Sequence, residues 1–105
     1  MSTLLHNLQA SADPERIAER LRIVRQVEGL SQAEFAQRAD IAPNAWNNYE
    51  KARKRISLDA AIRLCAEYGL TLDYIYFGDS GNLTYNLVNA IKAVEDRRRR
   101  GARDS

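Results

Sequence analysis

Three asparagines, at positions 44, 47 and 48, stand just ahead of a run of cations in this chain. Spacings of three and four residues place Asn44, Asn47 and Asn48 on one face of any helix that contains them. An asparagine amide donates and accepts at once, so it can bond N6 and N7 of an adenine and discriminate by about 1–3 kcal/mol. The cations within residues 51–55 can hold phosphates without reading bases. Together these residues predict a surface that recognises double-stranded DNA.

The same segment carries a second, apolar face. Trp46 and Tyr49 stand three residues apart, and we interpret them as core residues of the helix. Asparagine is a mediocre helix former, so three of them on the outer face of one short helix call for a functional reason. The alternative is an incidental polar surface.

Helix signals along the chain predict an all-α fold. Most expected helices start at a capping side chain or a proline, and glycines follow several of their ends. No run of alternating apolar and polar residues indicates a strand. The expected helices span residues 14–28, 32–39, 43–51, 58–68, 72–77 and 83–98.

The second and third of these helices position the asparagines. Ser31 and Glu34 have the spacing of a capping box, and Pro43 opens the following helix. Residues 40–42 form a tight turn between them, and Ile41 is predicted to point inward. A helix–turn–helix of this size suits the DNA major groove, which its second helix enters.

Apolar stripes predict which helix faces are buried. On the first helix the stripe is Ile17, Leu21 and Val24; on the helix over 58–68 it is Leu58, Ala61, Ile62 and Cys65; on the last it is Leu87, Ala90, Ile91 and Val94. The last stripe has two interpretations: a seam between two copies of the chain, or packing on its own domain.

Length and charge suggest one domain with two tails. We expect residues 1–12 to be flexible, 13–78 to form the helix–turn–helix domain, 79–98 to form a linker and helix, and 99–105 to be a disordered basic tail. The net charge is only +2, but cations cluster at 51–55 and 97–103, which favours an anionic partner. For 97–103 a solvated helix end is the alternative.

Several classes of protein are disfavoured. Cys65 and His6 are single, so we expect no disulfide, metal site or cofactor, and Cys65 is interpreted as a small buried residue. No apolar run is long enough for a membrane span, and no signal peptide is evident. The sequence contains no recognisable set of residues that could act together in acid–base or nucleophilic catalysis, so an enzyme is not expected. A reducing cytoplasm, with the protein on the nucleoid of a bacterial or phage-type system, fits this pattern.

A set of residues spread over 16–78 carries a family resemblance. It comprises Leu21-Arg22 with Arg25, Gly29-Leu30-Ser31-Gln32, Glu34-Phe35-Ala36, Ala39, Tyr49-Glu50, Leu58, Ala61-Ile62, Leu70-Thr71-Leu72-Asp73-Tyr74-Ile75 and Gly78. In these residues the chain resembles the lambda-repressor-like (Cro/C1-type, also called XRE) helix–turn–helix family. Two positions depart from the family pattern: Ala52 stands where relatives usually have glycine, and Pro43 stands where they usually have a polar residue.

The resemblance implies a five-helix lambda-repressor-like DNA-binding bundle, to which the helix over 83–98 is an addition. It implies that Arg25 pairs with Glu50 and so ties the first helix to the end of the third. The expected base contacts are Gln32, Asn44, Asn47 and Asn48, and the expected phosphate contacts are Ser31, Arg53, Lys54 and Arg55.

The leading hypothesis is a sequence-specific transcriptional regulator, most simply a repressor that binds a near-palindromic operator as a homodimer. A second hypothesis is an antitoxin or a phage- or plasmid-type interaction module, in which the bundle or its C-terminal helix binds a protein partner such as a toxin. The two hypotheses overlap, because antitoxins often keep a DNA-binding domain.

Overall fold

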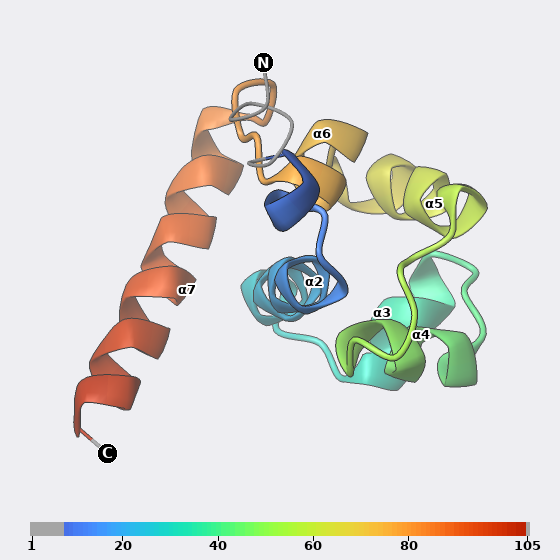
Figure 1. Cartoon of the computed structure of the whole chain (residues 1–105), viewed down its shortest axis with the longest axis horizontal. Helices are drawn as coiled ribbons and strands as arrows, with labels where there is room; N and C mark the ends of the chain where they lie inside the picture. Colours follow the sequence, from blue (N-terminus) through green and yellow to red (C-terminus); the bar gives the residue numbers. More distant parts are fainter. Residues whose placement is uncertain (1–7, 105) are drawn as a thin grey trace.

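The described part of the chain, residues 8–104 of a computed structural model, consists of helices joined by turns (Figure 1). The predicted all-α fold is confirmed over these residues. The helices after residue 13 are α2 (Pro14–Glu28), α3 (Gln32–Arg38), α4 (Pro43–Glu50), α5 (Leu58–Tyr68), α6 (Leu72–Phe77) and α7 (Tyr85–Asp104). The predicted bounds of the first five agree with these to within one residue at each end.

Local capping explains this agreement. Asp13 accepts a hydrogen bond from the backbone N–H of Glu15 at 2.9 Å, and Pro14 follows it as the first residue of α2. The hydroxyl of Ser31 accepts from the N–H of Glu34 at 3.2 Å and donates to the Glu34 carboxylate at 3.0 Å. Such caps each stabilise a helix by about 1 kcal/mol, so the sequence positions the helix starts without tertiary help.

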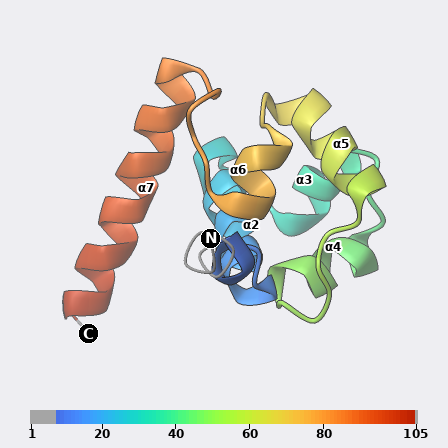
Figure 2. The ribbon, with the colours of Figure 1, turned by 45° about the horizontal axis from the view of Figure 1, so that its top comes forward.

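Helix α2 lies at the centre of the fold, with α3 and α4 on one side, α6 on another and α7 along a flank (Figure 1). The turned view shows α7 on the outside of the bundle, on the flank away from α5 (Figure 2). The largest fully buried side chains come from several helices: Trp46, Phe35, Ile17, Leu21, Leu64, Ile75 and Val24. Burial of each contributes about 1.5–3 kcal/mol. Ile41, in the turn after α3, is buried as predicted.

The buried face of α5 differs from the predicted one. Leu58 and Ile62 are exposed, at 57% and 50%, whereas Ala60, Ala61 and Leu64 are buried. Apolar residues occupy most positions of this helix, so its sequence is compatible with more than one inner face. In the packing that the structure adopts, Ala60, Ala61 and Leu64 face the bundle, and Leu58 and Ile62 face outward.

Helix α7 begins at Tyr85 rather than at the predicted residue 83, and it continues to Asp104 rather than ending at residue 98. Residues 99–104, expected as part of a disordered tail, are therefore helical. Arginine and alanine are good helix formers, and they outweigh the cost of about 1 kcal/mol for Gly101. Ile91 and Val94 of the predicted stripe are buried against the chain's own domain, and Leu87 is partly buried.

Before α2, residues 8–11 form a helical turn that the sequence pattern did not predict. The backbone N–H of Ala12 donates to the carbonyl of Leu8 at 3.0 Å. The guanidinium of Arg20 links this turn to α6, because it donates to the carbonyl of Ser11 at 2.7 Å and to that of Ile75 at 2.9 Å. Residues 1–7, with His6, lie outside the described residues.

Because Tyr74 is buried, we expect the free energy of unfolding to fall at strongly alkaline pH. Tyr74 is 5% exposed, and burial, followed by the nearby Glu95 carboxylate, raises its pKa to about 12. A pKa raised above the unfolded value of about 10 gives stability that is present below pH 10 and lost as pH rises toward 12. The loss expected for Tyr74 is about 2–3 kcal/mol by pH 12. Urea unfolding at mildly and strongly alkaline pH measures it, and Tyr74→Phe should reduce the difference.

The matched control is Tyr85→Phe, because Tyr85 is 80% exposed. This variant should keep the full alkaline loss. An equal loss in the Tyr74→Phe variant and the natural chain would show that other groups cause it.

Candidate nucleic-acid interface

Helix α4 separates its side chains into a buried face and an open one. Trp46, Tyr49 and Glu50 are buried, with exposures of 0%, 9% and 2%. Asn44 is exposed, and Asn47 and Asn48 are half-buried. Within residues 8–104, the side-chain amides of these three asparagines make no hydrogen bond to the protein. Their donors and acceptors are therefore available to a ligand.

The buried carboxylate of Glu50 joins three helices. Oε2 accepts from Nε of Arg25 at 2.7 Å and from the indole N–H of Trp46. Oε1 accepts from Nη2 of Arg25 at 3.0 Å and from the Gln32 amide at 3.2 Å. A charged group this deeply buried is tolerated because every lone-pair direction meets a donor. The network fixes α4 relative to α2 and α3.

Two arginines of α2 extend this network to the backbone. Arg25 donates from Nη1 to the carbonyl of Leu30 at 3.1 Å, and Arg22 donates to the carbonyl of Glu50 at the end of α4. The structure thus brings Arg25 and Glu50 together as the resemblance implies. The contacts from Trp46, Gln32 and Arg22 to Glu50 were not predicted from the sequence. The i, i+4 spacing of Trp46 and Glu50 was the signal that could have revealed the first.

Gln32, at the first position of α3, links this network to the outer surface. Its Nε2 donates to Glu50, so the amide is held in one orientation while its own Oε1 makes no hydrogen bond within the described residues. A side chain held in this way loses less conformational entropy when it contacts a ligand.

The predicted phosphate contacts fall into two groups. Arg53 and Lys54 are exposed, and neither side chain makes a hydrogen bond or an ion pair within the described residues. Arg55 instead donates from Nε to the carbonyl of Ala12 at 2.8 Å, and so fastens the loop after α4 to the N-terminal turn. Ser31 is exposed but serves as the N-cap of α3. Arg55 and Ser31, which were both predicted to contact phosphates, therefore also make hydrogen bonds within the protein.

Ala52, one of the two departures from the family pattern, lies in the left-handed region with φ of +58°. Its N–H donates to the Tyr49 carbonyl at 3.2 Å, and the N–H of Arg53 donates to the Asn48 carbonyl at 2.9 Å. These are the two hydrogen bonds of a Schellman motif, in which glycine is usual. The loop therefore keeps the turn that a glycine would make, and the alanine is strained.

We expect Ala52→Gly to stabilise the protein. Relief of the left-handed strain is worth about 1–2 kcal/mol, and the greater freedom of glycine in the unfolded chain offsets part of it, leaving roughly 1 kcal/mol. Urea unfolding measures the change. The matched control is Ala66→Gly at an exposed site within α5, which should lose about 1 kcal/mol. A loss of stability in both variants would contradict the assignment of strain to Ala52.

Comparison with known proteins identifies the family to which these residues belong. A helix-turn-helix domain family matches residues 16–74, more than half of the chain. The chain belongs to this helix-turn-helix family, a class of DNA-binding domain, and the matched range contains α3, α4 and the Glu50 network. No curated protein and no solved structure matched the chain.

No helix between residues 8 and 104 is long and apolar enough to cross a membrane. Within the same range, no group of three or more histidine, cysteine or acidic side chains is arranged to hold a metal ion.

Proposed function

We propose that the protein is a sequence-specific regulator of transcription, most simply a repressor that occludes a promoter, and that α4 enters the major groove of its operator. The observation that carries the proposal is the set of amides on Asn44, Asn47 and Asn48, whose hydrogen-bonding groups are unused. They stand on a helix that a buried ion pair holds in place. Such preorganised amides suit the recognition of adenine.

The surrounding residues have complementary roles in this proposal. Gln32 reaches a base or a phosphate from the start of α3, while Arg53 and Lys54 hold the DNA backbone after α4. Arg55 adds charge to the same region from its anchored position beside Ala12. Ser31 lies next to Gln32 and completes the phosphate contacts. Phosphate contacts orient the domain and give affinity, and the asparagines supply the sequence preference.

We further propose that two copies bind a near-palindrome, because one module of this size reads few base pairs. The buried stripe of α7 favours packing on its own domain, so the dimer contact would use another surface. Sedimentation at micromolar concentration, with and without operator DNA, tests the stoichiometry. A single copy on the operator would contradict the dimer.

Selection of bound sequences from a random double-stranded DNA pool, at about physiological salt, tests the function. The expected result is a near-palindrome with adenines at the positions that face the asparagines. Salt-sensitive binding with no recovered motif would contradict sequence-specific recognition.

The predicted role of Asn48 can be tested on the selected operator. Asn48→Ala should lose about 1–3 kcal/mol of discrimination at one position of each half-site and leave the other positions unchanged. The protein should remain folded, because alanine is the better helix former. The matched control is Asn89→Ala at an exposed site on α7. An unchanged sequence preference in the Asn48 variant would show that this asparagine does not read the operator.

A further inference from the structure

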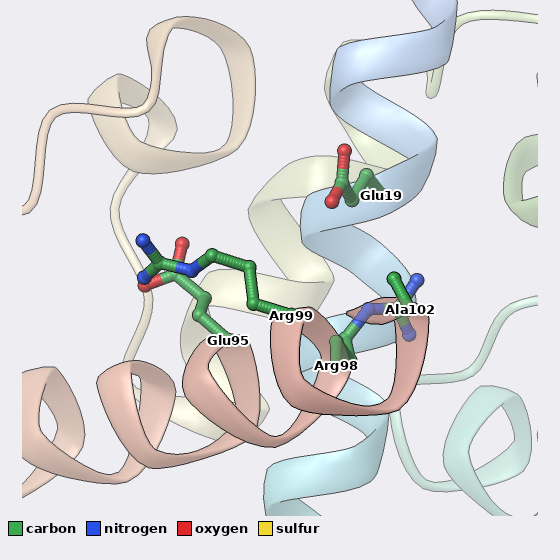
Figure 3. A pocket seen from close by; sticks show the side chains of 5 residues that line it. All are labelled: Glu19, Glu95, Arg98, Arg99 and Ala102. Atoms are coloured by element: carbon green, nitrogen blue, oxygen red, sulfur yellow. The ribbon is translucent and has the colours of Figure 1, made fainter. Parts of the chain in front are cut away.

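The C-terminal half of α7 projects arginines beside the proposed DNA-binding surface. Helix α7 crosses α2, and in Figure 1 it runs along the flank of α2 opposite to α3 and α4, from the level of α6 at its start to the level of α3 and α4 at its C-terminal end. The crossing is seen closely in Figure 3, where Arg98 points toward α2 and Arg99 points away along α7. Because residues 99–104 are helical, the backbone fixes the face of α7 from which each arginine extends.

The crossing places these cations next to the α2–α3 loop. Arg97 and Arg98 line an open groove of about 440 Å³ together with Gln26, Gly29 and Leu30. Nη1 of Arg98 donates to Oε1 of Gln26 at 3.2 Å, which ties the helix to the last turns of α2. Leu30 is followed directly by Ser31 and Gln32, the proposed contacts of α3. The groove therefore adjoins the outer edge of the DNA-binding surface.

The arginines differ in what they already bind. Arg99 donates to Asp96 at 3.0 Å and lies on the other side of the crossing, in a groove with Glu19 and Glu95. Arg97 and Arg100 are exposed, and neither side chain makes a hydrogen bond or an ion pair with the side chains that the structure describes, residues 8–102. They are three residues apart, so they share one face of α7. That face presents two positive charges.

We infer that Arg97 and Arg100 contact the DNA backbone that flanks the operator, with Arg98 anchoring the helix beside it. This inference rests on the proposed function and extends its interface beyond the helix–turn–helix. DNA phosphates supply anions at regular spacing, and guanidinium groups match them in geometry. The contact would add affinity and no base preference.

The test is Arg97→Gln combined with Arg100→Gln, with salt-dependent binding measured on two DNAs. One is a short duplex that contains only the operator, and the other carries about one helical turn of flanking DNA at each end. Each lost phosphate contact should lower the salt slope by about 0.9, so the double variant should lose about 1.8 for each bound copy, or about 3.6 for two copies on the long duplex. Its affinity there should fall by at least about tenfold at physiological salt. The short duplex should bind the variant and the natural chain alike.

The matched control removes two charges elsewhere through Arg16→Gln and Lys92→Gln. Both residues are exposed, Arg16 at the start of α2 and Lys92 on α7 before the crossing. The control should keep the salt slope on both duplexes. Circular dichroism of both double variants should match the natural chain, because exposed charges contribute little to folding.

The possible outcomes separate this inference from the proposed function. Equal slopes for the two double variants on the long duplex would overturn the flanking contact, and so would an equal loss on the short and long duplexes. If selection recovers no operator, the same comparison is made on short and long mixed-sequence duplexes. A motif with no slope change would uphold the proposed function alone, and a slope change with no motif would uphold the arginine contact alone.

Discussion

Replacing Glu50 with alanine should destabilise the protein by roughly 3 kcal/mol or more, which would lower its Tm by about 15 °C. The carboxylate is 2% exposed and accepts hydrogen bonds from Arg25, Gln32 and Trp46. Its removal leaves the Arg25 charge partly buried without its partner and leaves the indole N–H without an acceptor. Losing one member of a buried pair typically costs 3–5 kcal/mol. The low end applies because the Arg25 side chain keeps 23% exposure.

The Glu50→Gln variant keeps the shape of the side chain and removes its charge, so it tests whether the acceptor must be charged. Both oxygens of Glu50 face donors, so Glu50→Gln would place an NH₂ group against the donors of Arg25 or Trp46. We expect a loss of about 2 kcal/mol, since one buried donor is left without an acceptor and the charge of Arg25 is uncompensated. A Glu50→Gln variant within about 0.5 kcal/mol of the natural chain would contradict the need for a charged acceptor.

A double-mutant cycle with Arg25→Ala assigns the share of the ion pair. If the pair accounts for most of the loss, the Arg25→Ala and Glu50→Ala losses should not add, and the interaction energy should exceed about 1 kcal/mol. Strict additivity would assign the loss to Trp46 and Gln32 instead. Urea unfolding of all four proteins provides the measurement.

Local signals predicted most helix bounds. Asp13, Ser31 and Ser57 each cap a helix through an atom of their own side chain. The start of each of these helices is therefore determined by residues within a few positions of it. Gly29 ends α2 in the left-handed conformation for the same local reason. These features need no knowledge of the rest of the chain, which is why the sequence was sufficient for them.

Features that depend on packing were harder to predict. The inner face of α5 was wrong for Leu58 and Ile62 because several faces of that helix are apolar, and contacts with other helices select among them. The end of α7 was wrong because the arginine run was treated as a tail, although arginine favours helix. For α5 the deciding contacts lie outside the local pattern, whereas for α7 the helix propensity of the arginine run was a local signal that the prediction did not use.

The candidate site shows the same division. Spacing alone separated Asn44, Asn47 and Asn48 from Trp46 and Tyr49, because a short helix has two faces. The family resemblance supplied the pairing of Arg25 with Glu50. The position of Gln32 in the same network, and the attachment of Arg55 to Ala12, depend on side-chain directions that no spacing rule gives. The groove beside Arg97 follows from the crossing of α2 and α7.

Phe35 should be the other position where one substitution has a large effect, because it joins α3, α4 and α5. It is fully buried, its ring stacks on Tyr68 with centroids 4.1 Å apart, and it lies 4.9 Å from the ring of Trp46. Tyr68 also donates from its hydroxyl to the Phe35 carbonyl at 2.8 Å. Phe35→Ala should lose about 3–5 kcal/mol through the cavity it leaves.

Two milder variants separate packing from recognition. Phe35→Leu fills most of the volume and should lose about 1–2 kcal/mol, and Tyr68→Phe removes only the hydroxyl bond and should lose about 1 kcal/mol. Both should retain the operator preference of the natural chain, since neither residue belongs to the open face of α4. A Phe35→Leu variant that stays folded but selects a different operator sequence would show that this core residue also sets the position of the asparagines, and stability would then no longer account for its effect.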